Sequence, residues 1–179
     1  MAKAGNVEEY WFKDSQITYR KVGNGPAVLL AFHGFGQDHT AFSPLETATG
    51  NRFTLYSIDL FFHGNSRYTG TGTLTKTNWR QLIDHFLQAQ AIDRFSLMGF
   101  SLGGRFALAT AEAFPDRLDQ LLLIAPDGIT FNQWYWLATE SRLGRWLFRY
   151  TLRHLSLLTS LGHTLTALGL LNRTVMRFA

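Results

Sequence analysis

The distribution of apolar positions predicts short strands that alternate with helices along the first 130 residues. Residues 27–32 form a continuous apolar run, which is typical of a strand buried on both faces of a parallel sheet. Residues 8–22 predict two short strands around a turn at Asp14–Ser15. Further strands are expected at 51–59, 94–100 and 118–126, and helices at 79–90 and 102–115.

Turn and capping residues separate these elements. A loop rich in Thr and Gly is expected at 69–77, Asn78 is the predicted N-cap of the following helix, and Pro115 ends the next helix. Strands that alternate with helices of this length predict βαβ crossovers, so the predicted fold class is α/β, with a doubly wound, mostly parallel sheet. From Phe131 onward the pattern is helical, which predicts a core domain over 1–130 and a helical segment over 131–179.

Composition narrows the class of protein. The chain has 179 residues, 46% of them hydrophobic, which excludes a disordered protein. It has no cysteine, which excludes disulfides, thiolate chemistry and cysteine-based zinc sites. The first ten residues lack an apolar run, so no secretory signal is visible and a cytoplasmic location is expected.

The sequence GFSLGG (residues 99–104) follows a predicted strand and opens a predicted helix. It has the form G-x-S-x-G of a nucleophile elbow, in which a strained turn presents a serine at the carboxyl end of the strand. Ser101 is therefore the candidate nucleophile. The backbone N–H of Leu102, in the first turn of the helix, is a candidate donor to a developing oxyanion.

Two further loops follow strands that end at the same edge. HGFG (residues 33–36) follows the apolar run at 27–32, and the sequence DLFFHGNS begins at Asp59. Together with GFSLGG, in this order and spacing, they resemble the α/β-hydrolase superfamily, in the branch of esterases, lipases and C–C bond hydrolases. The resemblance covers about residues 8–130. One departure is Phe62, where the family often has glycine.

The resemblance implies a fold, an activity and site residues. It implies an eight-stranded sheet, a helical cap or lid from residue 131 onward, and a sequence that ends within or just after this cap, before the last two strands. It implies Ser101 as nucleophile and the backbone amides of Phe35 and Leu102 as the oxyanion hole. The activity implied is that of a serine hydrolase acting on an ester or related acyl bond, with a small acyl compound as substrate and no cofactor.

The acid and base of the expected triad are less evident. Asp127, at the end of the last predicted strand, is a weak candidate for the acid, because the sequence PDG is also ordinary turn chemistry. His154 and His163 follow Ser101 but lie in Leu-rich helical stretches, where a packing role is favoured. Without a triad histidine, only feeble hydrolysis is expected. Asp59 is expected to hold its own loop.

Several other hypotheses remain. A metal site of His33, Asp38 and His39 lacks a recognised ligand spacing, so no metal is expected. The chain is also compatible with a non-catalytic ligand-binding or interaction module on the same fold, lacking the triad acid and histidine. An exposed Leu-rich strand at 118–126 would favour self-association.

Charge suggests one rival partner. Residues 131–179 hold six Arg and one Glu. Four of these arginines have helical spacing, which suits either a solvated face of a cap helix, the favoured interpretation, or contact with an anionic membrane surface; they are Arg142, Arg145, Arg149 and Arg153. No nucleic-acid-binding motif is present, so no nucleic-acid partner is expected.

Overall fold

The computed structural model describes residues 5–49, 51–70 and 72–127, together with five later positions: Ser141, Leu143, Gly144, Trp146 and Tyr150. The chain divides into two compact units, Met1–Ile129 and Thr130–Ala179. The predicted arginine stripe and the histidines at 154 and 163 lie outside the described residues. The assignment of residues 131–179 as a cap stays a prediction.

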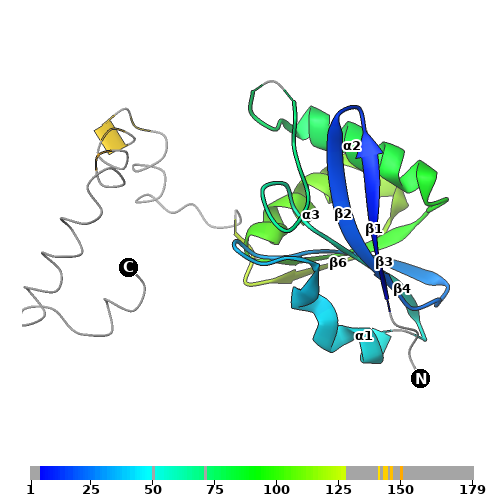
Figure 1. Cartoon of the computed structure of the whole chain (residues 1–179). Coiled ribbons are helices and arrows are strands. Elements are labelled where there is room, and N and C mark those ends of the chain that lie inside the picture. Colours follow the sequence, from blue (N-terminus) through cyan, green and yellow to red (C-terminus); the bar gives the residue numbers. More distant parts are fainter. Residues whose placement is uncertain are drawn as a thin grey trace, which may run out of the picture. The chain divides into compact units, whose positions relative to one another are not determined.

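A six-stranded sheet with strand order β1-β2-β4-β3-β5-β6 forms the centre of the first unit (Figure 1). The strands are β1 (Asn6–Phe12), β2 (Ser15–Val22), β3 (Ala27–Phe32), β4 (Phe53–Ile58), β5 (Phe95–Phe100) and β6 (Leu118–Ile124). Strands β4, β3, β5 and β6 are parallel, whereas β1 and β2 form an antiparallel hairpin that joins the sheet through β2 and β4. The predicted α/β class with a mostly parallel sheet is confirmed.

The helices lie on both faces of this sheet. They are α1 (Ser43–Thr49), α2 (Lys76–Ala89) and α3 (Leu102–Ala113), with short 3-10 helices η1 (His39–Phe42) and η2 (Pro115–Arg117). The main core contains the buried face of α2 together with Phe32, Phe95 and Leu97 of the strands. A smaller cluster on the other face includes Phe42 of η1 and Leu45 of α1 (Figure 1).

Several sequence-based boundaries were wrong by one to three residues. The first hairpin turns at Lys13 and Asp14, because Ser15 already pairs with Phe12. Thr75, not Asn78, is the N-cap of α2: its side chain accepts a hydrogen bond from the Asn78 N–H. Asn78 therefore lies inside the first turn. The short helices η1 and α1 had no periodic pattern long enough to predict them.

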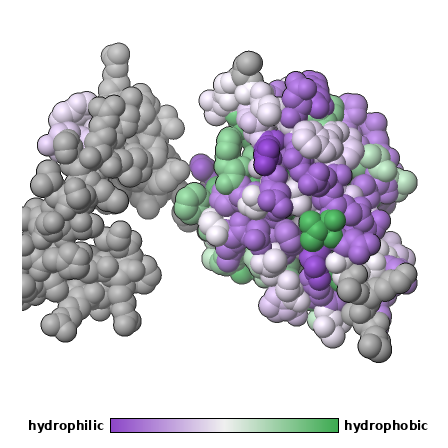
Figure 2. All heavy atoms as spheres, in the orientation of Figure 1, coloured by the Kyte–Doolittle hydropathy of each residue, from purple (hydrophilic) through white to green (hydrophobic). Residues whose placement is uncertain are grey.

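Strand β6 lies at one edge of the sheet, and none of its residues is fully buried. Leu121 and Leu123 pack against the main core, whereas Leu122 and Ile124 on the opposite face are each 45% exposed. The face of the first unit drawn in Figure 2 is mostly hydrophilic, with separate hydrophobic patches. Within the described residues β6 is an outermost strand with exposed Leu122 and Ile124, as the sequence predicts, while self-association stays a prediction.

Among the described residues, no helix is long and apolar enough to cross a membrane.

Candidate active site

Ser101 occupies a strained turn between β5 and α3. Its backbone has φ +51° and ψ −116°, and it is the N-cap residue of α3 without a capping hydrogen bond from its side chain. A serine N-cap normally has extended dihedrals, from which its oxygen caps the helix. The left-handed φ takes Ser101 out of this arrangement, so its hydroxyl is not used as a cap. The strained turn predicted for this residue is confirmed by its positive φ.

Two glycines allow β5, α3 and β3 to meet closely at the turn. A Cβ at Gly103 would lie 1.9 Å from the carbonyl oxygen of Phe32, at the end of β3. A Cβ at Gly99 would lie 2.7 Å from the carbonyl oxygen of Gly103. Any side chain at these positions would separate the strand from the helix. The motif glycines therefore fix where Ser101 lies relative to the loop after β3.

Backbone hydrogen bonds tie the end of β6 to Ser101. The Ser101 N–H donates to the carbonyl of Ile124 (3.0 Å), and the Asp127 N–H donates to the carbonyl of Ser101 (2.8 Å). Asp127 thus lies directly beside the serine. Its carboxylate lies 3.8 Å from a guanidinium nitrogen of Arg105, and both side chains are about half exposed. A contact of this kind contributes little to stability and leaves the carboxylate accessible.

The loop after β3 is held by its own polar groups. The Gln37 side-chain oxygen accepts from the Gly34 N–H (3.0 Å), and the Gln37 N–H donates to the Gly34 carbonyl (3.3 Å). Within the described part of the chain, the N–H groups of Phe35 and Leu102 donate no hydrogen bond. Both amides are therefore available to an incoming group. Their convergence on one point stays a prediction.

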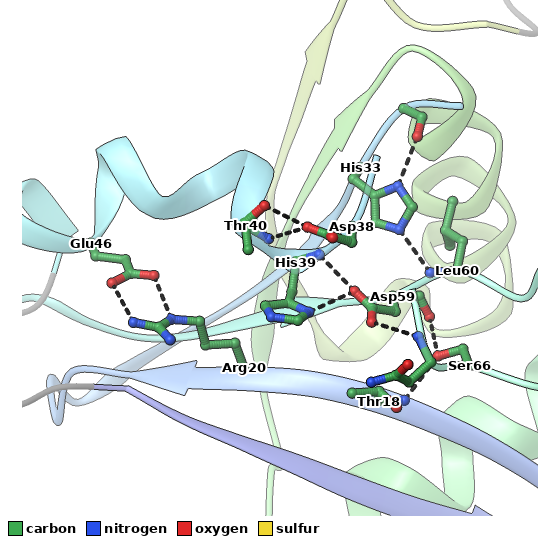
Figure 3. Close-up of polar contacts among 12 residues, drawn as sticks. Thr18, Arg20, His33, Asp38, His39, Thr40, Glu46, Asp59, Leu60 and Ser66 are labelled. Carbon is green, nitrogen blue, oxygen red and sulfur yellow. Dashed lines mark hydrogen bonds and ion pairs between the residues drawn. The ribbon is translucent and has the colours of Figure 1, made fainter. Parts of the chain in front are cut away.

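His33 is a structural residue of this loop. It is fully buried, its Nε2 accepts a hydrogen bond from the Leu60 N–H (2.9 Å), and its Nδ1 lies 2.7 Å from the Gly34 carbonyl oxygen (Figure 3). A carbonyl only accepts, so Nδ1 carries the proton and the ring is neutral. Burial lowers the pKa of His33, with the Gly34 carbonyl opposing this shift. His33 links the loops after β3 and β4 and has no nitrogen free for a metal ion.

Asp59 anchors the loop after β4 through a buried carboxylate. One oxygen accepts from the His39 backbone N–H (2.6 Å) and lies 2.9 Å from His39 Nδ1, and the other accepts from the Asn65 N–H (3.3 Å) (Figure 3). The carbonyl of Asp59 accepts from the Ser66 hydroxyl (2.7 Å). These partners fit the predicted role of Asp59 in holding its own loop. The pairing with His39 was not predicted, because 20 residues separate the two.

The three residues considered as metal ligands in the sequence have other partners in the structure. Asp38 accepts from the backbone and side chain of Thr40 at the start of η1, and these bonds lower the pKa of its carboxyl. His39 contacts Asp59, as described above. Among the described residues, no group of three or more His, Cys, Asp or Glu side chains could hold a metal ion.

No described side chain is hydrogen-bonded to the Ser101 hydroxyl. His63 lies near the site, where Nδ1 donates to the Phe61 carbonyl (3.0 Å) and the ring packs edge-on against Phe35 at 5.5 Å. His33, His39 and His63 thus contact groups of the loops after β3 and β4. The structure does not bring Asp127 and a histidine together at Ser101 within its described residues.

The sequence around this serine, and most of the rest of the chain, matches a known protein family. The family model for the alpha/beta hydrolase fold matches residues 27–171. The chain belongs to the alpha/beta hydrolase family. The three loops lie at the same end of the sheet because they follow parallel strands β3, β4 and β5.

Individual relatives match this chain over only part of their length. The chain is similar to an uncharacterized protein of Mycobacterium tuberculosis (33% identity over 112 residues; 63% of this chain, 32% of the relative). It is also similar to the pimeloyl-[acyl-carrier protein] methyl ester esterase of Nitrosomonas europaea (28% over 131 residues; 72% and 49%). The chain therefore spans about a third to a half of the length of these relatives.

Solved structures show the same fold. The carboxylesterase CesB of Bacillus subtilis superposes with a TM-score of 0.64 at 17% identity, over 75% of this chain and 48% of that protein. At this identity the likeness establishes the architecture of the sheet and its helices. The substrate of this alpha/beta hydrolase has to be inferred from the chain's own residues.

Proposed function

We propose that this alpha/beta hydrolase cleaves carboxylic esters through Ser101. The observation that carries the proposal is the geometry of this residue: a serine at φ +51°, at the carboxyl end of β5, whose hydroxyl does not cap the following helix. Backbone strain of this kind costs about 1–3 kcal/mol and is characteristic of functional sites. The esterase activity named for the Nitrosomonas relative supports the choice of an ester as the bond attacked.

The proposed reaction begins with attack of the Ser101 oxygen on the ester carbonyl carbon, while a base removes the hydroxyl proton. The amides of Phe35 and Leu102 stabilise the oxyanion of the tetrahedral intermediate. Collapse of this intermediate expels the alcohol, which takes up the proton, and leaves an acyl group on Ser101. Water then releases the acid and restores the serine.

Asp127 is the proposed acid, since its backbone is hydrogen-bonded to Ser101. The base of the proposed triad is left open, because no histidine among the described residues is hydrogen-bonded to the Ser101 hydroxyl.

A second function is favoured by that same absence. On this alternative the chain is a non-catalytic module that binds an ester or acyl ligand without turnover. Reaction of the purified chain with a fluorophosphonate probe, followed by mass spectrometry, separates the two. Covalent labelling at Ser101 that is lost in Ser101→Ala supports the hydrolase. Absence of labelling, or labelling that Ser101→Ala leaves unchanged, refutes Ser101 as an activated nucleophile.

Release of p-nitrophenol from p-nitrophenyl butyrate is the second measurement. Turnover that Ser101→Ala abolishes supports the esterase, whereas turnover that survives this change excludes it. Asp127→Ala is expected to lower this turnover, because Asp127 is the proposed acid. Asp119→Ala is its control and is expected to leave turnover unchanged, because Asp119 is exposed and pairs with Arg94 rather than lying beside Ser101.

A further inference from the structure

Phe62 combines an unfavourable backbone with an exposed side chain. Its φ is +68°, in the left-handed region that a bulky side chain rarely adopts. Its ring is 78% exposed, so core packing does not offset this strain. Glycine would adopt the same backbone without a steric cost. Neither the fold of the loop nor the core therefore explains a phenylalanine at this position.

The neighbouring loop presents a second exposed ring. Phe35 is 82% exposed and follows β3, while Phe62 follows β4. These strands are adjacent and parallel, and β5, which leads to Ser101, pairs with the other side of β3. The carboxyl ends of all three strands lie at the same edge of the sheet, so both rings belong to the edge that holds the serine.

His63 connects the two loops at this edge. Its ring lies 5.5 Å from that of Phe35 and 5.2 Å from that of His33. Its Nδ1–H donates to the Phe61 carbonyl, which fixes the ring on the loop that carries Phe62. The orientation of the Phe35 segment, whose amide is the proposed oxyanion donor, is thereby coupled to the segment of Phe62.

Burial of an exposed aromatic ring against an apolar group lowers the free energy. The ring carries no charge that would bind a charged or polar group. We infer that Phe62, together with Phe35, determines specificity by binding the apolar chain of an ester substrate, so that the substrate class is esters with a medium or long aliphatic chain. This inference rests on the proposed ester hydrolysis for its location. The aliphatic chain belongs to the acyl or the alcohol part, and the substrates below distinguish the two.

Phe62→Gly is the informative variant, because it removes the ring and relieves the backbone. Ala91→Gly is its matched control. Ala91 also has a positive φ (+51°), but it lies between α2 and β5, at the end of the sheet opposite to the one that holds Ser101. Both variants are expected to unfold at a temperature equal to or higher than that of the original chain. Only Phe62→Gly is expected to change substrate preference.

The kinetic test compares p-nitrophenyl acetate with p-nitrophenyl decanoate, and ethyl acetate with decyl acetate. Phe62→Gly is expected to lower kcat/KM for one long-chain ester by about tenfold or more, mainly through KM, and to change the acetate ester of the same pair by less than about twofold. Decanoate sensitivity places the chain in the acyl part, and decyl sensitivity places it in the alcohol part. Equal effects on short and long esters in both pairs overturn the inference.

A binding test keeps this outcome separate from failure of the proposed function. Calorimetric titration of the Ser101→Ala protein with 2-decanone and with 2-butanone needs no reaction. Binding of 2-decanone that Phe62→Gly weakens about tenfold or more supports the inference even if the chain hydrolyses nothing. Absence of binding, or binding unaffected by Phe62→Gly, overturns it even if Ser101 is an active nucleophile. A lower unfolding temperature or a changed oligomeric state in Phe62→Gly also overturns it, because the ring would then pack against protein.

Discussion

Replacement of Gly103 by alanine tests the close packing that positions the elbow. Gly103 is buried in the first turn of α3, and a Cβ there would lie 1.9 Å from the Phe32 carbonyl oxygen and 2.7 Å from that of His33. A carbon in contact with a carbonyl oxygen needs about 3.3 Å, so α3 and the end of β3 would have to separate by roughly 1.4 Å.

Two effects of opposite sign compete in Gly103→Ala. Alanine is the better helix former by about 1 kcal/mol. Overpacking costs about 1–3 kcal/mol, and here the obstacle is backbone, which no change of rotamer can move aside. We therefore expect the clash to dominate and the free energy of unfolding to fall by about 2 kcal/mol, which is the upper end of the overpacking range less the gain in helix propensity.

Urea unfolding followed by circular dichroism measures this change, provided that the transition is two-state. Gly36→Ala is the control, since it too adds one methyl group, here to a loop glycine with φ +72°. Nothing lies within 4 Å of the new atom, so only a backbone cost of about 1 kcal/mol is expected. A Gly103→Ala protein as stable as the original chain, or more stable, would show that helix propensity dominates. The close approach of α3 to β3 would then be refuted.

Three further predictions concern the loops and the open edge. The pKa of buried His33 is lowered, so at acid pH the unfolded chain binds a proton that the folded chain does not. The free energy of unfolding should therefore fall as the pH decreases below about 6.5, by up to about 1.4 kcal/mol per pH unit. A His33→Gln variant that keeps the full slope would contradict this. Asp59→Asn should lower the free energy of unfolding by about 2–4 kcal/mol, because a buried carboxylate with three donor contacts is lost, whereas exposed Asp119→Asn should cost less than about 1 kcal/mol; equal losses would argue against a special role for the buried group. Light scattering at ~100 μM should show self-association that Leu122→Lys reduces and Val7→Lys, on the opposite edge strand, does not; a monomer at this concentration would refute pairing through β6.

Much of the framework could be predicted from local pattern. The continuous apolar run at 27–32 located β3, because a strand covered on both faces has few polar positions. The G-x-S-x-G pattern predicted the strained turn at Ser101, which the structure shows as a positive φ. Boundaries were less accurate. Thr75 and Asn78 are both good capping residues, and only the hydrogen bond to Thr75 decides which one begins α2.

The sequence by itself determined the fold class, the position of the strained turn at Ser101 and the end of the sheet at which the three loops meet. Each of these depends on residue periodicity or on steric limits within a few neighbouring residues. The tertiary structure decided which polar groups these loops use. The pairing of His39 with Asp59, the neutral state of buried His33 and the bond from Asp127 to Ser101 join residues that lie 20 or more positions apart or take their character from burial. The exposure of Phe62 at a left-handed position belongs to the same group. Such properties depend on which segments pack together, and a local sequence pattern does not specify contacts between distant segments.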